Sequence, residues 1–496
     1  MVNVKKTSFY LTGFRLVRAF LGIASVLLTA RFFGASKERD FFVLAMTTTT
    51  VLPALTFGAL SEIFRAKFVH IRETLNLENA VASARTLIWG IFFISLTMVV
   101  LGIYKAELLA TVFSENISEN SLRELAFMIR LTLPIMIFSQ LSAYWSRALN
   151  CFESFYVPEI AGMISSIIEV ILIVCFAPMI GIYSLLISSY FSNILLLSAV
   201  VFLLHRKCPE FFSLKIESFL AIKPYILAAV PFWFGNLLGQ VTTIVERKFS
   251  SGFGIGNVAI LDYAQKLNSV PLSVVFSVVA SVLTPVLAKY FANNCKNEFA
   301  NESLSFYRFI LILFAPFVFL MFFCSGEIGN LLFASNVSSQ EINKFAVAVS
   351  IYAFGLFGVI HYIVFMQVLV AKGENAKVSV VVALNQIIIV ACNLLFAYRF
   401  GIWGFVTSWS VCHFVSGLTL MFMSKINPKD ITASIVKITM LYLFSFGLFF
   451  LIKNIFYTLG DVFKIILSLL VFAVILLIGL FVFRFEERKK IWAKIF

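Results

Sequence analysis

The sequence has little charge and little that could form an enzyme site. Charged residues make up 13% of its 496 residues, while 61% are hydrophobic and 58 are Phe. The seven cysteines show no CxxC spacing and the four histidines are scattered, so neither a disulfide framework nor a metal site is expected. A Walker-type phosphate loop and a nucleophile elbow are also missing. We therefore expect no catalytic residue, no metal and no cofactor.

Long apolar stretches dominate what is present. Stretches able to cross about 30 Å of hydrocarbon recur roughly fourteen times, from 8–33 to 463–484, with the eighth at 258–288. They lack the alternating pattern of outer-membrane strands, so the expected fold is an all-α integral membrane protein with about 14 transmembrane helices. The first stretch carries Arg15 and Arg18 and has no small-residue cleavage site after it, so it is expected to be retained as a helix rather than cleaved.

The basic residues indicate how the chain is oriented. Most of the 39 Lys and Arg fall on one side of this threading, which the positive-inside rule makes cytoplasmic. Both termini are then cytoplasmic, including the tail residues Arg488, Lys489 and Lys490. The net charge of +14 is therefore a topology signal and implies no nucleic-acid partner. An inner or plasma membrane is the expected location.

Two halves of the chain resemble each other. RFFGASKERDFFVLA from Arg31 aligns without a gap on KFSSGFGIGNVAILD from Lys248, and GIY from Gly181 aligns on GIW from Gly401. This predicts a duplication of six helices, with one lobe at 1–210 and a second at 211–430. Because each lobe has an even number of helices, a pseudo-twofold axis along the membrane normal would relate them. Two additional helices and a basic tail occupy 431–496.

Three of the expected helices carry polar stripes at three- and four-residue steps, which place each set on one helical face. The stripes are Arg15, Arg18, Gly22, Ser25 and Thr29; Asn236, Gln240, Thr243 and Arg247; and Asp262, Lys266, Ser269, Ser273 and Ser277. A charge at the bilayer centre costs roughly 2.5 to 3.5 kcal/mol on insertion scales, so such residues usually face water, a partner or a substrate. Snorkelling arginines and packing by small or hydroxylated residues are the alternatives.

The stripes predict a cationic cavity. Arg15, Arg18, Arg247 and Lys266 supply the positive charge, and Asp262 lies one turn from Lys266 as its expected ion-pair partner. Guanidinium groups hold phosphate oxygens bidentately, so a diphosphate headgroup is the expected ligand. Asn236, Gln240 and Trp233 are predicted to meet its sugar.

Three segments resemble the MurJ/MviN lipid II flippases of the multidrug/oligosaccharidyl-lipid/polysaccharide exporter superfamily. They are ARFFGASKERDFFVLA from Ala30, FGALSEIF from Phe57 and DYAQKLNSVPLSVVFSVVASVLTPVLAKYF from Asp262. The resemblance implies a transporter that flips an undecaprenyl-diphosphate-linked sugar from the cytoplasmic to the periplasmic leaflet, with its lipid tail along the last two helices. It also implies binding roles for Arg31 and Lys266 and gating roles for Asp40 and Ser61.

Departures from the family pattern shape the predicted substrate. Ser25 and Val26 stand where lipid II flippases have an Arg-Asp pair, and TTTTVLPAL replaces an arginine-bearing segment of the second helix. We therefore predict a flippase for a surface-polysaccharide repeat unit, with a polysaccharide polymerase as a partner to test. The alternatives are a lipid II flippase, a multidrug cation exporter and a scaffold without transport. A membrane potential or an ion gradient is left open as the driving force.

Overall fold

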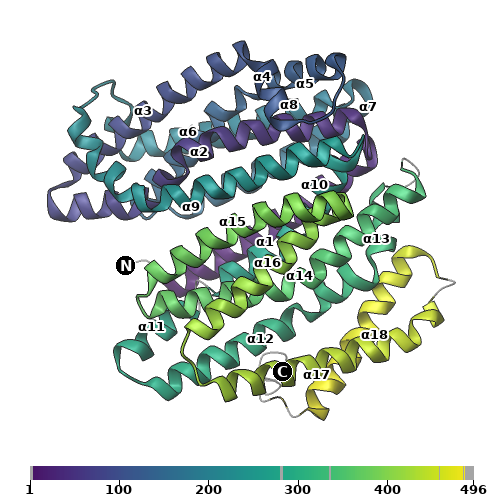
Figure 1. The fold of residues 1–496 in the computed structure, drawn as a ribbon. Coiled ribbons are helices and arrows are strands. Elements are labelled where there is room, and N and C mark those ends of the chain that lie inside the picture. The colour runs from purple at the N-terminus through teal and green to yellow at the C-terminus, as the bar shows by residue number, and fades with distance from the viewer. Residues whose placement is uncertain (1–3, 280–282, 334–336, 457–458, 484, 486–496) are drawn as a thin grey trace. The chain divides into compact units, whose positions relative to one another are not determined.

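The apolar stretches form long helices. The structure, a computed structural model, describes residues 4–279, 283–333, 337–456, 459–483 and 485, so the predicted basic tail at 488–490 lies outside the described residues. Among those described, thirteen helices are long and apolar enough to cross a membrane (Figure 1). The expected span at 258–288 is not one of the thirteen; it includes residues 280–282, which lie outside the described part of the chain.

The chain folds as two compact units, Met1–Ala259 and Ile260–Phe496. The first contains α1 (Val4–Phe33), α2 (Lys37–Thr74), α3 (Leu77–Tyr104), α4 (Ala106–Phe113), α5 (Glu119–Thr132), α6 (Ile135–Cys151), α7 (Tyr156–Ile180), α8 (Tyr183–Lys207), the 3-10 helix η1 (Pro209–Phe212) and α9 (Phe219–Gly252). Within it α1 packs on α7, and α2 packs on α3, α5, α6 and α9. The expected lobe boundary at residue 210 concerns the duplication and stays a prediction; in the structure α9 lies with the first unit.

The second unit holds the remaining helices. They are α10 (Asn257–Val278, beginning in the first unit), α11 (Thr284–Ala292), α12 (Lys296–Phe323), α13 (Ser325–Phe333), α14 (Ser339–Ala371), α15 (Asn375–Phe400), α16 (Ile402–Met423), α17 (Pro428–Ile452), the 3-10 helix η3 (Lys453–Phe456) and α18 (Asp461–Val482). Helix α14 packs on α12, α13 and α16. Stacked rings of Phe319 and Phe472, with centroids 4.0 Å apart, join α12 to α18. Aromatic packing thus fixes one face of α18, whose other faces carry many exposed apolar residues.

Proline breaks one of the expected spans. The span expected from hydropathy at 125–147 is divided between α5 and α6, and Pro134 stands at the junction as the residue before α6. Proline has no N–H to donate and its ring clashes with the preceding turn, so the helix is interrupted there. A span that reads as one hydrophobic segment therefore consists of two helices.

The turns that end α7 and α15 have the same backbone geometry. Gly181 has φ 58° and ψ −137°, and Gly401 has φ 59° and ψ −140°. Each glycine N–H donates to a carbonyl of the preceding helix, at Ala177 and Ala397 respectively. A residue with a Cβ is strained at these angles, so glycine suits both turns. These are the two glycines that the sequence alignment of the halves pairs.

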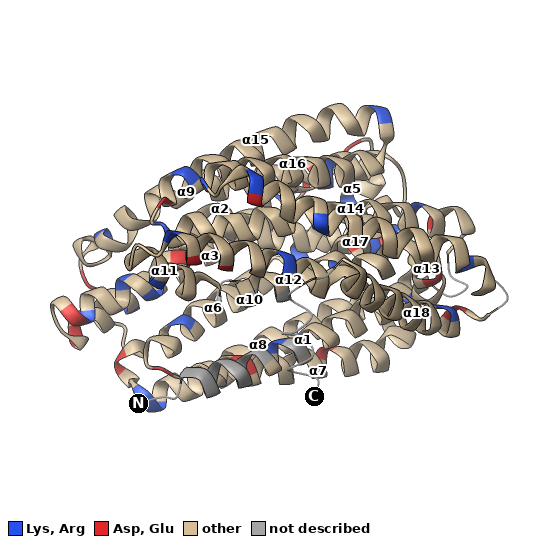
Figure 2. Cartoon of the chain, turned by 90° about the horizontal axis from the view of Figure 1, so that it is seen from below, with Lys and Arg blue, Asp and Glu red and all other residues tan. Residues whose placement is uncertain are grey.

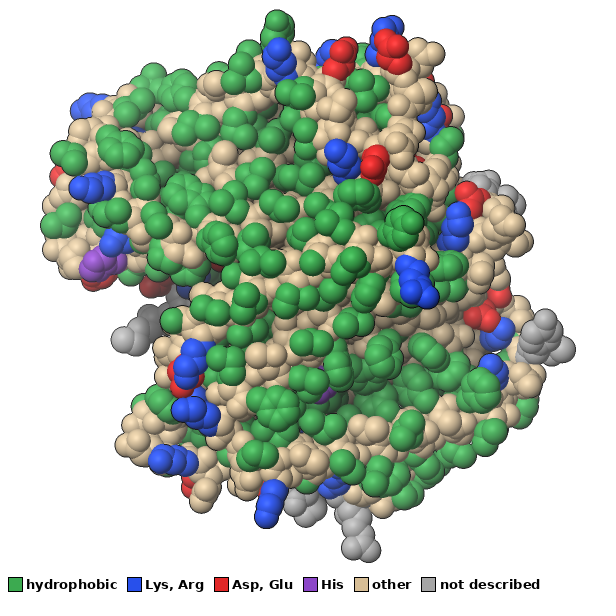
Figure 3. All heavy atoms as spheres, viewed as in Figure 1, with side chains coloured by type: hydrophobic (Ala, Val, Ile, Leu, Met, Phe, Trp, Pro, Cys, Tyr) green, Lys and Arg blue, Asp and Glu red, His purple; other side chains and the backbone are tan. Residues whose placement is uncertain are grey.

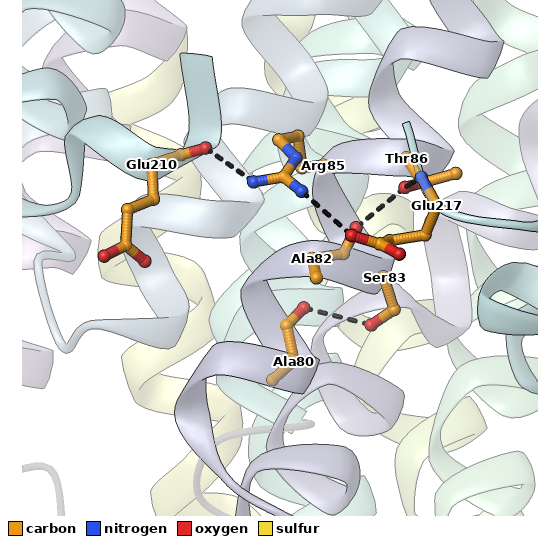
Figure 4. A network of polar contacts seen from close by, with 7 residues as sticks. All are labelled: Ala80, Ala82, Ser83, Arg85, Thr86, Glu210 and Glu217. Carbon is orange, nitrogen blue, oxygen red and sulfur yellow. Dashed lines mark hydrogen bonds and ion pairs between the residues drawn. The ribbon is translucent and has the colours of Figure 1, made fainter. Parts of the chain in front are cut away.

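The segment 208–218 that links α8 to α9 is fastened to α3 (Figure 4). The Arg85 guanidinium donates to the Glu210 carbonyl oxygen at 3.1 Å and contacts the Glu217 carboxylate at 3.5 Å. The Glu217 N–H donates to the Thr86 hydroxyl at 3.0 Å. Phe211 is fully buried against the same unit. The linker is therefore part of the packed fold of the first unit.

Charged side chains lie mainly toward the helix ends. Figure 2 shows most Lys, Arg, Asp and Glu near these ends, with long helix bodies between them carrying few charges. On the face seen in Figure 3, hydrophobic side chains cover much of the surface. Exposed large hydrophobic residues run along most of the long helices. Such a surface is suited to hydrocarbon rather than to water.

Candidate substrate-binding site

The two arginines of α1 lie against the first turns of α7. The Arg15 Nε is 3.0 Å from the Glu159 Oε1, with the arginine side chain 56% exposed and the glutamate 20%. The Arg18 guanidinium lies over Gly162, where a Cβ atom would come within 2.9 Å of the Arg18 Nη1. Both arginines are exposed, and they share one edge of the α1–α7 pair. The stripe predicted on the first helix thus presents two guanidinium groups side by side.

Two residues predicted to meet sugar donate hydrogen bonds to carbonyl oxygens of α2. The Trp233 Nε1 donates to the Thr56 carbonyl oxygen at 3.2 Å, and the Asn236 Nδ2 donates to the Ala54 carbonyl oxygen. Asn236 also fits over Gly58, where a Cβ would collide with its amide. These polar atoms hold α9 against α2, the packing role given above as the alternative. Their proposed sugar contacts stay predictions.

Asp40 binds the start of α10. Its Oδ2 accepts the Gly256 N–H at 2.6 Å and its Oδ1 accepts the Ala259 N–H at 2.7 Å. Asp40 is buried, and Gly256 has φ 85°, with the carbonyl of Ala35 in the space a Cβ would need. A carboxylate at a helix N-terminus satisfies N–H groups that the helix itself cannot. The residue predicted to gate therefore joins two turns of the first unit.

The other predicted residues of the first unit occupy different settings. Arg31 is exposed in the last turn of α1, and Gln240 is half-buried in α9. The Ser61 hydroxyl donates within α2 to the Gly58 carbonyl oxygen at 2.8 Å. Arg247 is 6% exposed, with Glu246 3.9 Å away. A buried arginine beside a carboxylate is a poor site for an incoming anion. The anion would lose its hydration on entering the buried site and would also have to displace the carboxylate.

Asp262 and Lys266 form the ion pair expected from their spacing. The Lys266 Nζ is 3.0 Å from the Asp262 Oδ2, with the lysine side chain 48% exposed. Both belong to the second unit, whereas Arg15, Arg18 and Arg247 belong to the first. A cavity lined jointly by these residues stays a prediction. About half of the Lys266 side chain remains exposed although it is paired with Asp262.

The second unit contains a large apolar cavity of about 510 Å³ among α12, α14, α16 and α17. Its lining residues include Leu311, Phe322, Phe354, Phe414, Leu443 and Phe446. At its wall the Tyr307 hydroxyl and the His361 Nε2 are 2.6 Å apart, and the His361 Nδ1 faces the Phe357 carbonyl oxygen. With these polar atoms satisfied by each other, the cavity suits a hydrocarbon chain. The predicted tail site involved the last two helices; α17 lines this cavity.

Sequence reasoning missed Glu159 and Gly162, which are the neighbours of Arg15 and Arg18. They lie in a helix more than a hundred residues further along, and periodicity within one helix cannot show which other helix packs on it. One signal was present: Glu159 is an acid in the first turn of a largely apolar segment whose other acid is Glu169. An unexplained membrane acid near membrane arginines is a candidate pair.

Comparisons with known proteins agree with this architecture. A model of the family described as lipid II flippase MurJ matches residues 29–478. A probable lipid II flippase MurJ of Buchnera aphidicola is 23% identical over 372 residues, covering 72% of this chain and 70% of that protein. The lipid II flippase MurJ of Burkholderia cenocepacia is 23% identical over 406 residues, covering 78% and 77%.

Solved structures show the same fold. The structure of a lipid II flippase MurJ in an inward closed conformation has a TM-score of 0.81 at 20% identity and covers 97% of this chain and 100% of that one. An inward-facing multidrug resistance MATE family transporter of the MOP superfamily has a TM-score of 0.67 at 12% identity, covering 84% and 95%. The family-model match spans most of the chain. This multi-pass membrane protein therefore belongs to the lipid II flippase MurJ family.

Proposed function

We propose that the protein flips lipid II, the diphosphate-linked lipid for which its family is named, across the bacterial inner membrane. The observation that carries the proposal is the family match over residues 29–478, together with a fold that matches a lipid II flippase from end to end. We therefore prefer lipid II to the surface-polysaccharide unit that the sequence departures favoured. The direction, from the cytoplasmic to the periplasmic leaflet, and the cytoplasmic termini are part of the proposal.

The headgroup would be held by the guanidinium groups of Arg15 and Arg18. They lie in the first turns of the apolar part of α1, which begins near Gly13. A diphosphate offers several oxygens, and two adjacent planar guanidinium groups can each take a pair of them. The apolar cavity beside α17 would suit part of the hydrocarbon tail. Arg15 and Arg18 are therefore the proposed diphosphate contacts of the first unit, and a contact with Lys266 of the second unit stays a prediction.

A surface-polysaccharide unit is the second candidate, and one observation favours it. The hydroxyls of Thr47, Thr48, Thr49 and Thr50 all donate to carbonyls of α2 itself, so this segment offers neither charge nor free hydroxyl hydrogens where the family has arginines. A lipid with a different sugar would fit a headgroup site that depends less on α2. The predicted polysaccharide polymerase partner belongs to this second candidate only.

Complementation separates these candidates. Expression in cells depleted of their own lipid II flippase should restore growth, whereas failure at normal membrane levels would favour the polysaccharide unit. Replacing both Arg15 and Arg18 by Ala should abolish rescue, because the diphosphate loses its paired guanidinium groups. Arg123→Ala is the matched control, since Arg123 is an exposed arginine paired with Glu119 on α5. Full rescue by the double variant would instead remove Arg15 and Arg18 from the proposed headgroup site. Resistance to cationic dyes on expression would support a multidrug exporter.

A further inference from the structure

We propose that Glu159 is a built-in counter-ion that holds Arg15 while the headgroup site is empty and is displaced from it by the incoming diphosphate. This rests on the proposed function, because the displacing anion is the diphosphate of the lipid substrate. In the headgroup site, the Glu159 carboxylate would then compete with the diphosphate for Arg15. The competitor would limit how tightly headgroups are held and would leave the paired arginine neutralised between transport events.

The geometry of the pair makes it easy to exchange. The Arg15 Nε and the Glu159 Oε1 are 3.0 Å apart, and more than half of the arginine side chain is exposed. Exposed ion pairs are weak, since solvent screens the attraction and two long side chains must be held in one arrangement. A diphosphate offers a larger charge and a bidentate geometry, which the single contact with Glu159 does not. The diphosphate should therefore win the competition.

Glu159 has a reason to stay in place when Arg15 leaves. It lies in the first turn of α7, where helix N–H groups lack intrahelical partners and the helix dipole favours negative charge. The carboxylate thus keeps a favourable setting without the arginine. Arg15, on a long flexible side chain of α1, is the member of the pair that is free to swing toward an anion.

Arg18 lies one helical turn from Arg15 and has a different neighbour. Its guanidinium lies over Gly162, three residues after Glu159, with the Arg18 Nη1 2.9 Å and Cζ 3.2 Å from where a Cβ would be. Within the part of the chain that the structure describes, Arg18 makes no hydrogen bond or ion pair. Gly162 therefore positions a guanidinium that can receive the first phosphate, after which the second can take Arg15 from Glu159.

Calorimetric titration of the detergent-solubilised full chain with farnesyl diphosphate, a short polyprenyl diphosphate, tests the counter-ion. Glu159→Gln should bind about 2- to 5-fold more tightly, the worth of one exposed ion pair. Arg15→Ala should bind more weakly, and adding Glu159→Gln to it should give no further gain, because the competition needs both partners. Unchanged or weaker binding by Glu159→Gln would overturn the proposal. So would an equal gain in affinity when Glu159→Gln is added to Arg15→Ala.

A second variant tests the glycine. Gly162→Ala places a methyl group against the Arg18 guanidinium, the movable end of a flexible side chain, and should weaken farnesyl diphosphate binding modestly. The thermal unfolding midpoint should stay unchanged or rise, because alanine favours helix. Gly90→Ala in α3 is the matched control, since a Cβ there meets no atom within 4 Å. Equal affinity of Gly162→Ala and wild type would remove Gly162 from the proposal.

The source of the anion is separated in the same assay. Nanodiscs of phosphatidylglycerol and of phosphatidylcholine distinguish a diphosphate site from one that takes any acidic lipid headgroup. A gain for phosphatidylglycerol in Glu159→Gln without one for farnesyl diphosphate would overturn the diphosphate assignment. No binding of farnesyl diphosphate by the wild type or by any variant would reject the proposed function itself, whereas binding without the Glu159 effect would reject only this inference.

Discussion

At the scale of single residues, Asp40 shows how a buried carboxylate is put to use. Both of its oxygens are occupied, by the N–H groups of Gly256 and Ala259, at the beginning of α10. Charge-assisted hydrogen bonds of this kind are shorter and stronger than neutral ones. The carboxylate therefore contributes to the stability of the first unit, whatever part it also has in transport.

Replacing Asp40 by Asn should lower the stability of the protein. The amide keeps one acceptor oxygen but turns an NH₂ group toward a backbone N–H, so we expect a loss of about 1.5 to 3 kcal/mol. Thermal unfolding in detergent measures it. Glu38→Gln is the control, because Glu38 is an exposed acid in the same helical turn and its loss should change little. Equal midpoints for the two variants would contradict the assigned role.

Individual residue roles were only partly predictable from the sequence. The four-residue spacing of Asp262 and Lys266 predicted their ion pair, because such a contact is local to one helix. The predicted sugar contacts of Trp233 and Asn236 depended on which surface the stripe of α9 faces. Periodicity shows that residues share a face, but it cannot show whether water or another helix lies opposite. Here α2 lies opposite, and its carbonyls accept their hydrogen bonds.

At the scale of elements, the linker between α8 and α9 depends on Arg85. The side chain is only 8% exposed and reaches two points of the linker, the Glu210 carbonyl and the Glu217 carboxylate. Losing one partner of a buried charged contact costs more than losing an exposed pair, because the remaining polar groups stay buried. Loss of the Arg85 side chain should therefore loosen the linker.

Arg85→Gln should loosen the linker and speed its cleavage by trypsin. Lys215 is an exposed trypsin site within the linker, and detachment of the flanking contacts should raise its cleavage rate severalfold. Mass spectrometry of timed digests would follow the fragment that ends at Lys215. Arg123→Gln removes an exposed ion pair on α5 and should leave this rate unchanged. A rate that is the same in Arg85→Gln and wild type would mean that the contacts of Thr86 and Phe211 hold the linker without Arg85.

The helices themselves were largely predictable, and their interruptions were not. Hydropathy predicted spans that the structure has as long helices, because twenty apolar residues have few alternatives in hydrocarbon. The division of the span expected at 125–147 by Pro134 was missed, since a hydropathy average does not respond to a single proline. The span expected at 258–288 contains α10 and α11, and residues 280–282 between them lie outside the described residues.

At the scale of the whole molecule, the duplication predicted from weak sequence matches has a local structural counterpart. The turns at Gly181 and Gly401 agree to within a few degrees, and each is followed directly by a helix, α8 and α16. The chain also turns with positive φ at Glu153 and Gly373, ahead of α7 and α15. The duplication itself stays a prediction.

Because the turns at Gly181 and Gly401 have the same backbone angles, we expect the same substitution to lower the stability equally at both. Gly181→Ala and Gly401→Ala should each destabilise the protein by about 1 to 3 kcal/mol, because the same backbone angles are forced on a residue with a Cβ. Differential scanning of the purified variants measures this. Gly90→Ala, at an uncrowded position within α3, should be neutral or slightly stabilising. A large cost at one turn and none at the other would show that the two turns are not equivalent.

The junction at Asp40 also has a consequence for biogenesis. Its two N–H donors lie 216 and 219 residues further along the chain. At 5 to 20 residues per second, roughly 10 to 40 s of synthesis separate the carboxylate from its partners. Throughout that interval, α2 lies in the membrane with the Asp40 carboxylate lacking the N–H donors of Gly256 and Ala259, because these residues have not yet been synthesised. A delay in inserting α9 and the start of α10 would therefore expose this half of the protein to quality-control proteases.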